Sequence, residues 1–145
     1  MRCQGKPDTS FELLEHPADI GFRVYGTDLS DLFANCACAL LSLILDASRT
    51  EPVEQYSISA EGSDYESLLV NFLNEVLYYI DGKRLAFADF VIQDLDEVHI
   101  NCIASGEPRS RNRHPGKLVV KAVTYHQLKV AKEGDHWIAE VYVDI

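Results

Sequence analysis

Two segments of this chain carry apolar side chains at helical spacing, and the segments around them alternate as strands do. The helical segments cover residues 29–44 and 65–80, where apolar residues recur three and four positions apart. Apolar and polar residues alternate over residues 20–25, 56–61 and 98–105, which is the period of a half-buried strand. The pattern therefore predicts a chain that is mostly strand, with two helices placed among the strands.

The order of these segments predicts the fold class. Further strands are expected over residues 11–15, 85–95, 118–130 and 137–145, which gives the order ββαβαββββ. Two helices with one apolar face each suit one side of a mostly antiparallel sheet, so we expect an α+β fold. At 145 residues, without repeats or a long linker, we expect one domain over residues 11–145 after a mobile leader at residues 1–10.

The second helix has the clearest end signals. Ser63-Asp64-Tyr65-Glu66 predicts a capping box, in which the side chains of Ser63 and Glu66 satisfy free backbone N–H groups. Asp81-Gly82 predicts the end of the helix, with Gly82 in the left-handed conformation that commonly follows a helix.

The net charge of −10 and the pI near 4.8 argue against nucleic-acid binding through bulk charge. No uncharged apolar run reaches the roughly 18 residues of a membrane span, and the first residues do not resemble a signal peptide. We therefore expect a cytoplasmic protein that does not enter a membrane. The four cysteines lack metal-site spacing, and Cys36 and Cys38 would point to different sides of a helix, so buried thiols are expected.

One segment departs from the acidic average. Residues 107–132 hold seven basic side chains and one acidic side chain. Arg109, Arg111 and Arg113 lie at alternate positions there, and guanidinium groups bind phosphates or carboxylates bidentately. These arginines could contact a partner or a phosphate, or balance the acidic surface within the molecule, and composition alone favours neither reading.

The last strand brings two carboxylates to the end of the sequence. Asp144 and the α-carboxylate of Ile145 would lie within a few Å of each other, and one more acidic group would complete an all-oxygen site for a hard cation. Without a third ligand, an ordinary chain end is the better interpretation. His16 and Asp19, three apart before a strand, are by themselves more typical of a structural hydrogen bond.

Several segments, in the same order along the chain, resemble the archease family. They are Glu15–Phe22 followed by Tyr25-Gly26, Leu69–Tyr78, Gly106-Glu107-Pro108 with Arg113-His114, Lys121–His126, and Val143-Asp144-Ile145. The sequence departs from the family at Pro17, where members usually have Thr, and at residues 110–112, which lack the usual acidic, proline-containing pattern.

The resemblance implies a function that the residues alone do not reach. Archeases are protein cofactors of the RtcB-type tRNA-splicing ligase, not enzymes. They promote guanylylation of the ligase and its multiple turnover, and they broaden its use of nucleoside triphosphates. Some are described as chaperone-like modulators of RNA-processing enzymes. The expected partner is thus the ligase, with tRNA contacted only indirectly.

The resemblance also implies a cation site formed by Asp19, Asp144 and the α-carboxylate of Ile145. Oxygen ligands suit Ca²⁺ best, with Mg²⁺ or Mn²⁺ as alternatives, and suit Zn²⁺ poorly. The expected neighbours of this site are His16, Lys121, Thr124 and His126.

The strand register near this site depends on the turn of the last hairpin. A two-residue turn at Glu133-Gly134 would place Asp144 opposite Val123, and a three-residue loop would place it opposite Thr124. We favour the longer loop, because Glu is a poor first residue for a tight turn.

Two other functions compete with the activator role. The chain could be a metal-assisted hydrolase or phosphotransferase that uses Asp19 and Asp144, with His16 or His126 as the base. It could also bind RNA directly through residues 109–132, which the net charge disfavours.

Overall fold

The computed structural model describes Cys3, residues 11–16 and residues 19–145, without the side chains of residues 15 and 16. The elements are, in order, β1 (Phe11–His16), β2 (Asp19–Gly26), α1 (Leu29–Ile44), β3 (Glu54–Glu61), α2 (Tyr65–Leu77), the π-helix η2 (Tyr78–Gly82), β4 (Leu85–Leu95), β5 (His99–Pro108), β6 (Ala122–Glu133) and β7 (His136–Asp144). The predicted order of strands and helices is confirmed.

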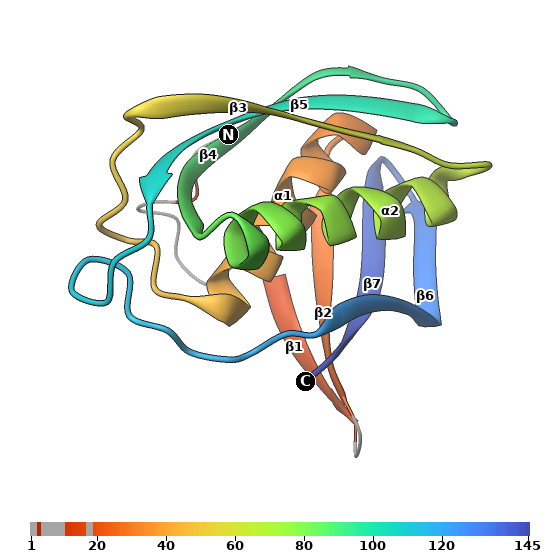
Figure 1. Ribbon diagram of the computed structural model, residues 1–145. Coiled ribbons are helices and arrows are strands. Elements are labelled where there is room, and N and C mark those ends of the chain that lie inside the picture. The colour runs from red at the N-terminus through yellow and green to blue at the C-terminus, as the bar shows by residue number, and fades with distance from the viewer. Residues whose placement is uncertain (1–2, 4–10, 17–18) are drawn as a thin grey trace.

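The strands form two antiparallel sheets instead of one. The first has the order β1-β2-β7-β6 and the second the order β3-β5-β4. The two helices lie between them (Figure 1): α1 contacts β2 and β4, and α2 contacts β3 and β6. Each sheet therefore carries helices on one face, as expected for this α+β fold.

The helix α1 is buried on most of its surface because both sheets and α2 surround it. It begins at the cap residue Asp28, whose side chain accepts a hydrogen bond from the Asp31 N–H at 2.8 Å. Phe33 of α1 and Phe72 of α2 are fully buried and meet with ring centroids 6.2 Å apart. Each such side chain contributes about 1.5–3 kcal/mol through burial.

The ends of α2 differ from the prediction. The capping box is formed by Asp64 and Ser67, one residue later than expected, since the Asp64 side chain accepts from the Ser67 N–H and Ser67 Oγ lies 3.2 Å from the Asp64 nitrogen. The expectation that Gly82 adopts the left-handed conformation is also wrong. The helix runs on into η2, and the left-handed residue is Arg84, with φ of 57°.

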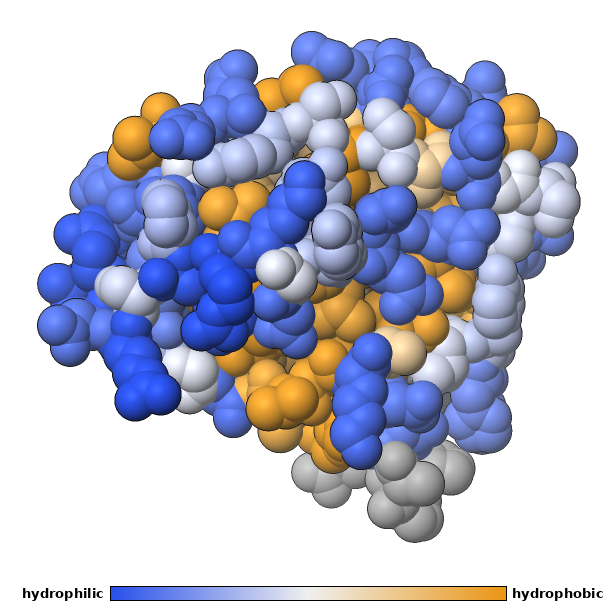
Figure 2. Space-filling view, in the orientation of Figure 1, coloured by the Kyte–Doolittle hydropathy of each residue, from blue (hydrophilic) through white to orange (hydrophobic). Residues whose placement is uncertain are grey.

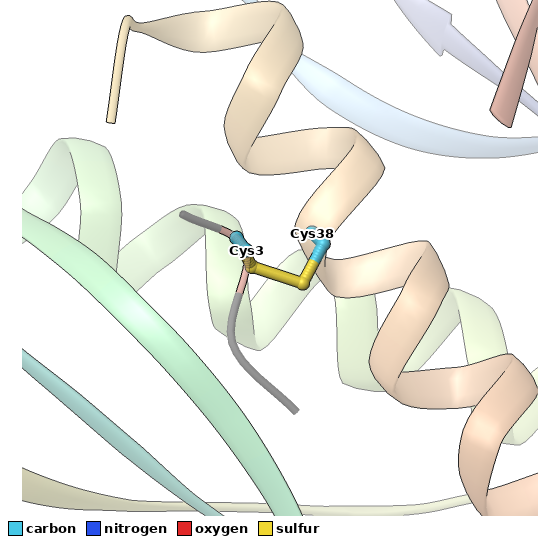
Figure 3. The surroundings of a disulfide bond; sticks show 2 residues. All are labelled: Cys3 and Cys38. Atoms are coloured by element: carbon cyan, nitrogen blue, oxygen red, sulfur yellow. A yellow bond between two sulfur atoms is a disulfide. The ribbon is translucent and has the colours of Figure 1, made fainter. Parts of the chain in front are cut away.

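Two of the four cysteines form a disulfide, contrary to the expectation of thiols. Cys3 and Cys38 are bonded, with their Cα atoms 5.6 Å apart (Figure 3). The Cys3 N–H also donates to the Ala88 carbonyl of β4 at 2.9 Å. The pattern missed this pair because the two cysteines are 35 residues apart in sequence. Cys36 and Cys102 are buried thiols as expected, and burial raises the pKa of Cys102 to about 12.

Most of the expected leader falls outside the described residues, namely positions 1–2 and 4–10. The domain assignment therefore stays a prediction, although Cys3 is joined to α1 and β4. Among the described residues, no helix has both the length and the apolar character needed to cross a membrane.

Candidate functional site

Asp19 and Asp144 lie directly opposite each other where β2 and β7 pair. The apolar alternation sets this register, because Phe22 pairs with Val141 and both face the core. Asp19 and Asp144 each lie three residues from these core-facing positions, so both share the outer face of the sheet. Opposed residues of an antiparallel pair have Cβ atoms about 4.5–5.5 Å apart, so two carboxylates meet at this position.

The two aspartates differ in their exposure to solvent. Asp19 is 8% exposed, whereas Asp144 is exposed and forms no salt bridge with a described residue. Two like charges at this distance repel each other unless a cation or a proton is shared between them. The pair is therefore a candidate site for a positively charged ligand.

The edge strand β6 borders Asp144 on the side away from β2. Ala122 lies opposite Asp144, and the Lys121 N–H donates to the Asp144 carbonyl at 2.8 Å. Thr124 lies opposite Tyr142, and its hydroxyl donates to the Tyr142 carbonyl at 3.3 Å. The structure thus places the expected neighbours Lys121 and Thr124 beside the strand that carries Asp144.

The predicted register of this hairpin is wrong. Glu133 pairs with His136 around a two-residue turn, and Gly134 there has φ of 64°. The longer loop that we favoured does not form. The sequence gives no sign of a β-bulge between Thr124 and Lys129, which shifts the register so that Asp144 faces Ala122.

Because of the bulge, His126 lies on the same sheet face as the two aspartates. Gln127 within it has φ of 51°, and the His126 ring lies edge-on to Tyr142 with centroids 6.0 Å apart. Tyr142 in turn lies across Gly21, where a Cβ would be 2.7 Å from its ring. The sequence reasoning missed Tyr142, although a glycine inside a strand is a signal for close approach of another group.

The remaining expected site residues are less well placed. Residue His16 lies opposite Asp19 in the β1–β2 ladder, but its side chain is outside the described part of the chain. Ile145 follows β7 and is 42% exposed. Within the described residues, no three His, Cys, Asp or Glu side chains gather as a metal site. The Asp19–Asp144 pair nevertheless supplies the oxygen ligands that a hard cation prefers, and a third ligand stays a prediction.

Two of the three arginines in the basic segment form intramolecular ion pairs. Arg109 bonds to Asp81 at 3.0 Å, and Arg113 bonds to Glu107 at 3.2 Å. Only Arg111 is exposed without an ion pair to a described residue. The charges of Arg109 and Arg113 are therefore largely balanced by acidic residues of the same molecule.

The Glu107 carboxylate organises the loop that follows β5. It accepts hydrogen bonds from the buried His114 Nε2 at 2.9 Å, from Arg113 Nε and from the Glu51 N–H. His114 Nδ1 accepts from the Ser110 N–H, which makes Nε2 the protonated nitrogen. Burial by itself would raise the pKa of Glu107, yet these hydrogen bonds outweigh it and lower the pKa. Gly106-Glu107 and Arg113-His114 are thus structural residues.

The fold and the carboxylate pair define a small antiparallel α+β protein with a candidate cation centre at one sheet end. The archease protein family (MTH1598/TM1083) matches residues 11–145. "Protein archease" of Pyrococcus furiosus is 40% identical over 139 residues, covering 93% of this chain and 98% of its own length. The protein of the same name from Methanopyrus kandleri is 39% identical, covering 93% and 99%. This chain belongs to the archease family.

Solved structures agree with this assignment. The solution structure of Methanobacterium thermoautotrophicum protein 1598 matches with a TM-score of 0.81 and 31% identity, over 94% of this chain and 99% of that one. A Thermotoga maritima crystal structure, described as "an archease, possible chaperone", matches with a TM-score of 0.62 and 22% identity, over 92% and 96%. The second likeness shows the fold alone.

Proposed function

We propose that this chain is a non-catalytic protein cofactor of an RtcB-type tRNA-splicing ligase. In this role it promotes guanylylation of the ligase, supports multiple turnover and broadens the use of nucleoside triphosphates. The observation that carries the proposal is the pairing of Asp19 with Asp144 across adjacent strands, which suits the cation site that the family resemblance implies. Membership of the archease family supports this proposal, and the ligase is the partner that the sequence resemblance implies.

In this proposal a divalent cation, Ca²⁺ in preference to Mg²⁺ or Mn²⁺, binds Asp19 and Asp144. The α-carboxylate of Ile145 is the proposed third ligand. A bound cation neutralises the two carboxylates and offers positive charge at the surface, where an anionic group of the partner can approach. Lys121, Thr124 and His126 border this point, and Lys121 adds a further positive charge.

The ligase assay separates activation from the competing enzymatic role. RNA ligation by an RtcB-type ligase is measured under single-turnover and multiple-turnover conditions, with and without this protein. We expect faster guanylylation and more turnovers with the protein present. Unchanged guanylylation and turnover would refute the proposal, and hydrolysis of phosphoesters by the purified protein alone would favour a metal-assisted hydrolase.

Cation binding is tested separately by calorimetry. Asp19→Asn and Asp144→Asn each remove one ligand charge with little change in shape. Asp135→Asn is the matched control, since Asp135 is exposed in the turn at the other end of β7. We expect the first two variants to bind Ca²⁺ at least about tenfold more weakly, with no change in the control. Addition of one glycine after Ile145 tests the third ligand, and unchanged affinity would exclude it.

A further inference from the structure

A polar hollow lies away from the aspartate pair, beside the C-terminal end of α2. Its volume is about 420 Å³, and η2, the residues after it and the chain segment 116–119 surround it. Three cationic side chains line it, those of Arg84, Arg109 and Lys117, against the single carboxylate of Asp81. Figure 2 shows strongly hydrophilic side chains over this end of α2, next to apolar side chains. The hollow is therefore positively charged on a protein whose net charge is −10.

Arg109 forms the inner wall and keeps unused donors. Its side chain is 11% exposed, and Nη1 donates to the Ile80 carbonyl at 3.3 Å and to Asp81 at 3.0 Å. A guanidinium has five N–H donors, and neither Nε nor Nη2 bonds to any described protein atom. A largely buried cation with free donors is expensive unless a further acceptor is available.

The other two cations are exposed and have no ion pair among the described residues. Lys117 helps to lower the pKa of Asp46, after the larger effect of the Ser48 hydrogen bonds, but the two form no salt bridge. Even with Asp46 counted against Lys117, the hollow keeps an excess of positive charge. Both long side chains are free to move onto an anion.

Arg84 occupies its position at a cost in backbone energy. Its φ of 57° is left-handed, which disfavours residues with a Cβ by about 1–2 kcal/mol. Glycine would fit this backbone without that cost, and the Arg84 carbonyl accepts from the Arg109 N–H at 2.8 Å, which ties the two residues together. An arginine held in a conformation that favours glycine indicates a use for its side chain.

We propose that this hollow binds a phosphate-bearing ligand. The phosphate lies on Arg84, Arg109 and Lys117, because guanidinium forks match phosphate oxygens bidentately and a lysine adds a point charge. The lining also has an apolar wall, formed by Leu118 and by Val119, which is 75% exposed. A ribose or a base can cover this wall. A free nucleotide and a phosphorylated RNA end share this chemistry, and the site does not depend on the ligase.

The test is calorimetric titration of the intact protein in buffer without divalent cations, so that the aspartate pair takes no part. The probes are tripolyphosphate, GTP and a short oligoribonucleotide with a 5′-phosphate. We expect saturable binding of at least one probe by the wild type. Arg84→Gly and Lys117→Ala should each weaken it by about tenfold or more. Lys132→Ala is the control, an exposed lysine on β6 outside the hollow.

The outcomes are distinct from those for the cation site. If GTP binds more tightly than tripolyphosphate, the ligand is a nucleotide. If the oligoribonucleotide binds more tightly than both, the ligand is a phosphorylated RNA end. Arg84→Gly should melt at or above the wild-type temperature because it relieves the left-handed conformation. If that variant unfolds, Lys117→Ala decides, since only its side chain is removed. Absence of saturable binding by the wild type, or equal binding by Lys117→Ala and Lys132→Ala, would overturn the proposal.

Discussion

Gly106 is the residue at which the fold tolerates least change. A Cβ at this position would overlap the Ala86 carbonyl oxygen and would lie 2.9 Å from Phe87 Cα. Both are backbone atoms of the paired strand β4, so neither can move aside cheaply. The glycine is needed here for close approach of two strands and not for an unusual φ.

Gly106→Ala should therefore lower the free energy of unfolding by about 3 kcal/mol or more, since overpacking against backbone has no low-cost relaxation. Urea unfolding measures the change. Gly116→Ala is the control, because a Cβ there meets nothing within 4 Å, and it should change stability by less than about 0.5 kcal/mol. A loss in Gly106→Ala no larger than in the control would show that β4 and β5 can separate.

Glu107 makes stability depend on acid pH. Its pKa is lowered because hydrogen bonds from Glu51, His114 and Arg113 outweigh the effect of burial. A carboxylate with a depressed native pKa stabilises the fold fully above its unfolded value of about 4.3. That contribution is lost as the pH falls through the native pKa.

Glu107→Gln should cost about 2 kcal/mol at pH 7, because three bonds to a charged acceptor are weakened. The difference from the wild type should shrink on acidification below about pH 4. Urea unfolding at several pH values measures both effects, with Glu97→Gln in the exposed turn before β5 as control. A difference that stays constant with pH would show that the charge of Glu107 is unimportant.

At the scale of elements, the contact between α2 and β6 positions the strand that borders the aspartates. Asn74 donates to the Val123 carbonyl at 3.0 Å and accepts from the Val123 N–H at 2.9 Å. Its side chain thus occupies the hydrogen-bonding edge of β6 in place of another strand. Val123 is 4% exposed, so water cannot easily replace the amide.

Asn74→Ala should cost about 2–3 kcal/mol, because it leaves one buried donor and one buried acceptor unpaired. Asn71→Ala, one turn earlier, is the matched control. Asn71 makes a single exposed hydrogen bond to the Glu61 carbonyl, so a loss of about 0.5–1 kcal/mol is expected. Equal losses in the two variants, by urea unfolding, would contradict this role of Asn74.

The elements show what periodicity can and cannot predict. The bounds of α1 and β4 match the sequence prediction because apolar spacing and end signals lie within those segments. The bulge at residues 125–128 and the left-handed Arg84 could not be predicted, since both depend on partners distant in sequence. In the site, Asp19 and Asp144 were predicted from the family resemblance together with strand alternation. Tyr142 was missed because its place depends on Gly21 in another strand.

At the scale of the whole molecule, the Cys3–Cys38 disulfide joins the start of the chain to α1. The two cysteines are 35 residues apart, and a crosslink of that length restricts the unfolded chain by about 2–4 kcal/mol. Reduction should therefore lower the melting temperature by about 10 °C.

Cys3→Ser separates the disulfide from other effects of reductant. The variant should melt at the temperature of the reduced wild type, and added reductant should not change it further. Calorimetric scans with and without reductant measure this. A wild type that melts identically in both conditions would show that the crosslink does not stabilise the fold.

Charge is distributed over the molecule in separate regions. The aspartate pair lies where β2 begins and β7 ends, close to the C-terminus in Figure 1, whereas the cationic hollow lies beside η2. The net charge of −10 describes neither region. We propose cation binding and partner activation for the first region and phosphate binding for the second.

The most direct measurement of the central claim is multiple-turnover RNA ligation by an RtcB-type ligase with this protein as wild type, Asp144→Asn or Asp135→Asn. We expect the wild type and Asp135→Asn to raise the number of turnovers equally. Asp144→Asn should lose about tenfold or more of that stimulation, because one carboxylate of the pair is gone. Equal stimulation by all three proteins would contradict a functional role for the Asp19–Asp144 pair.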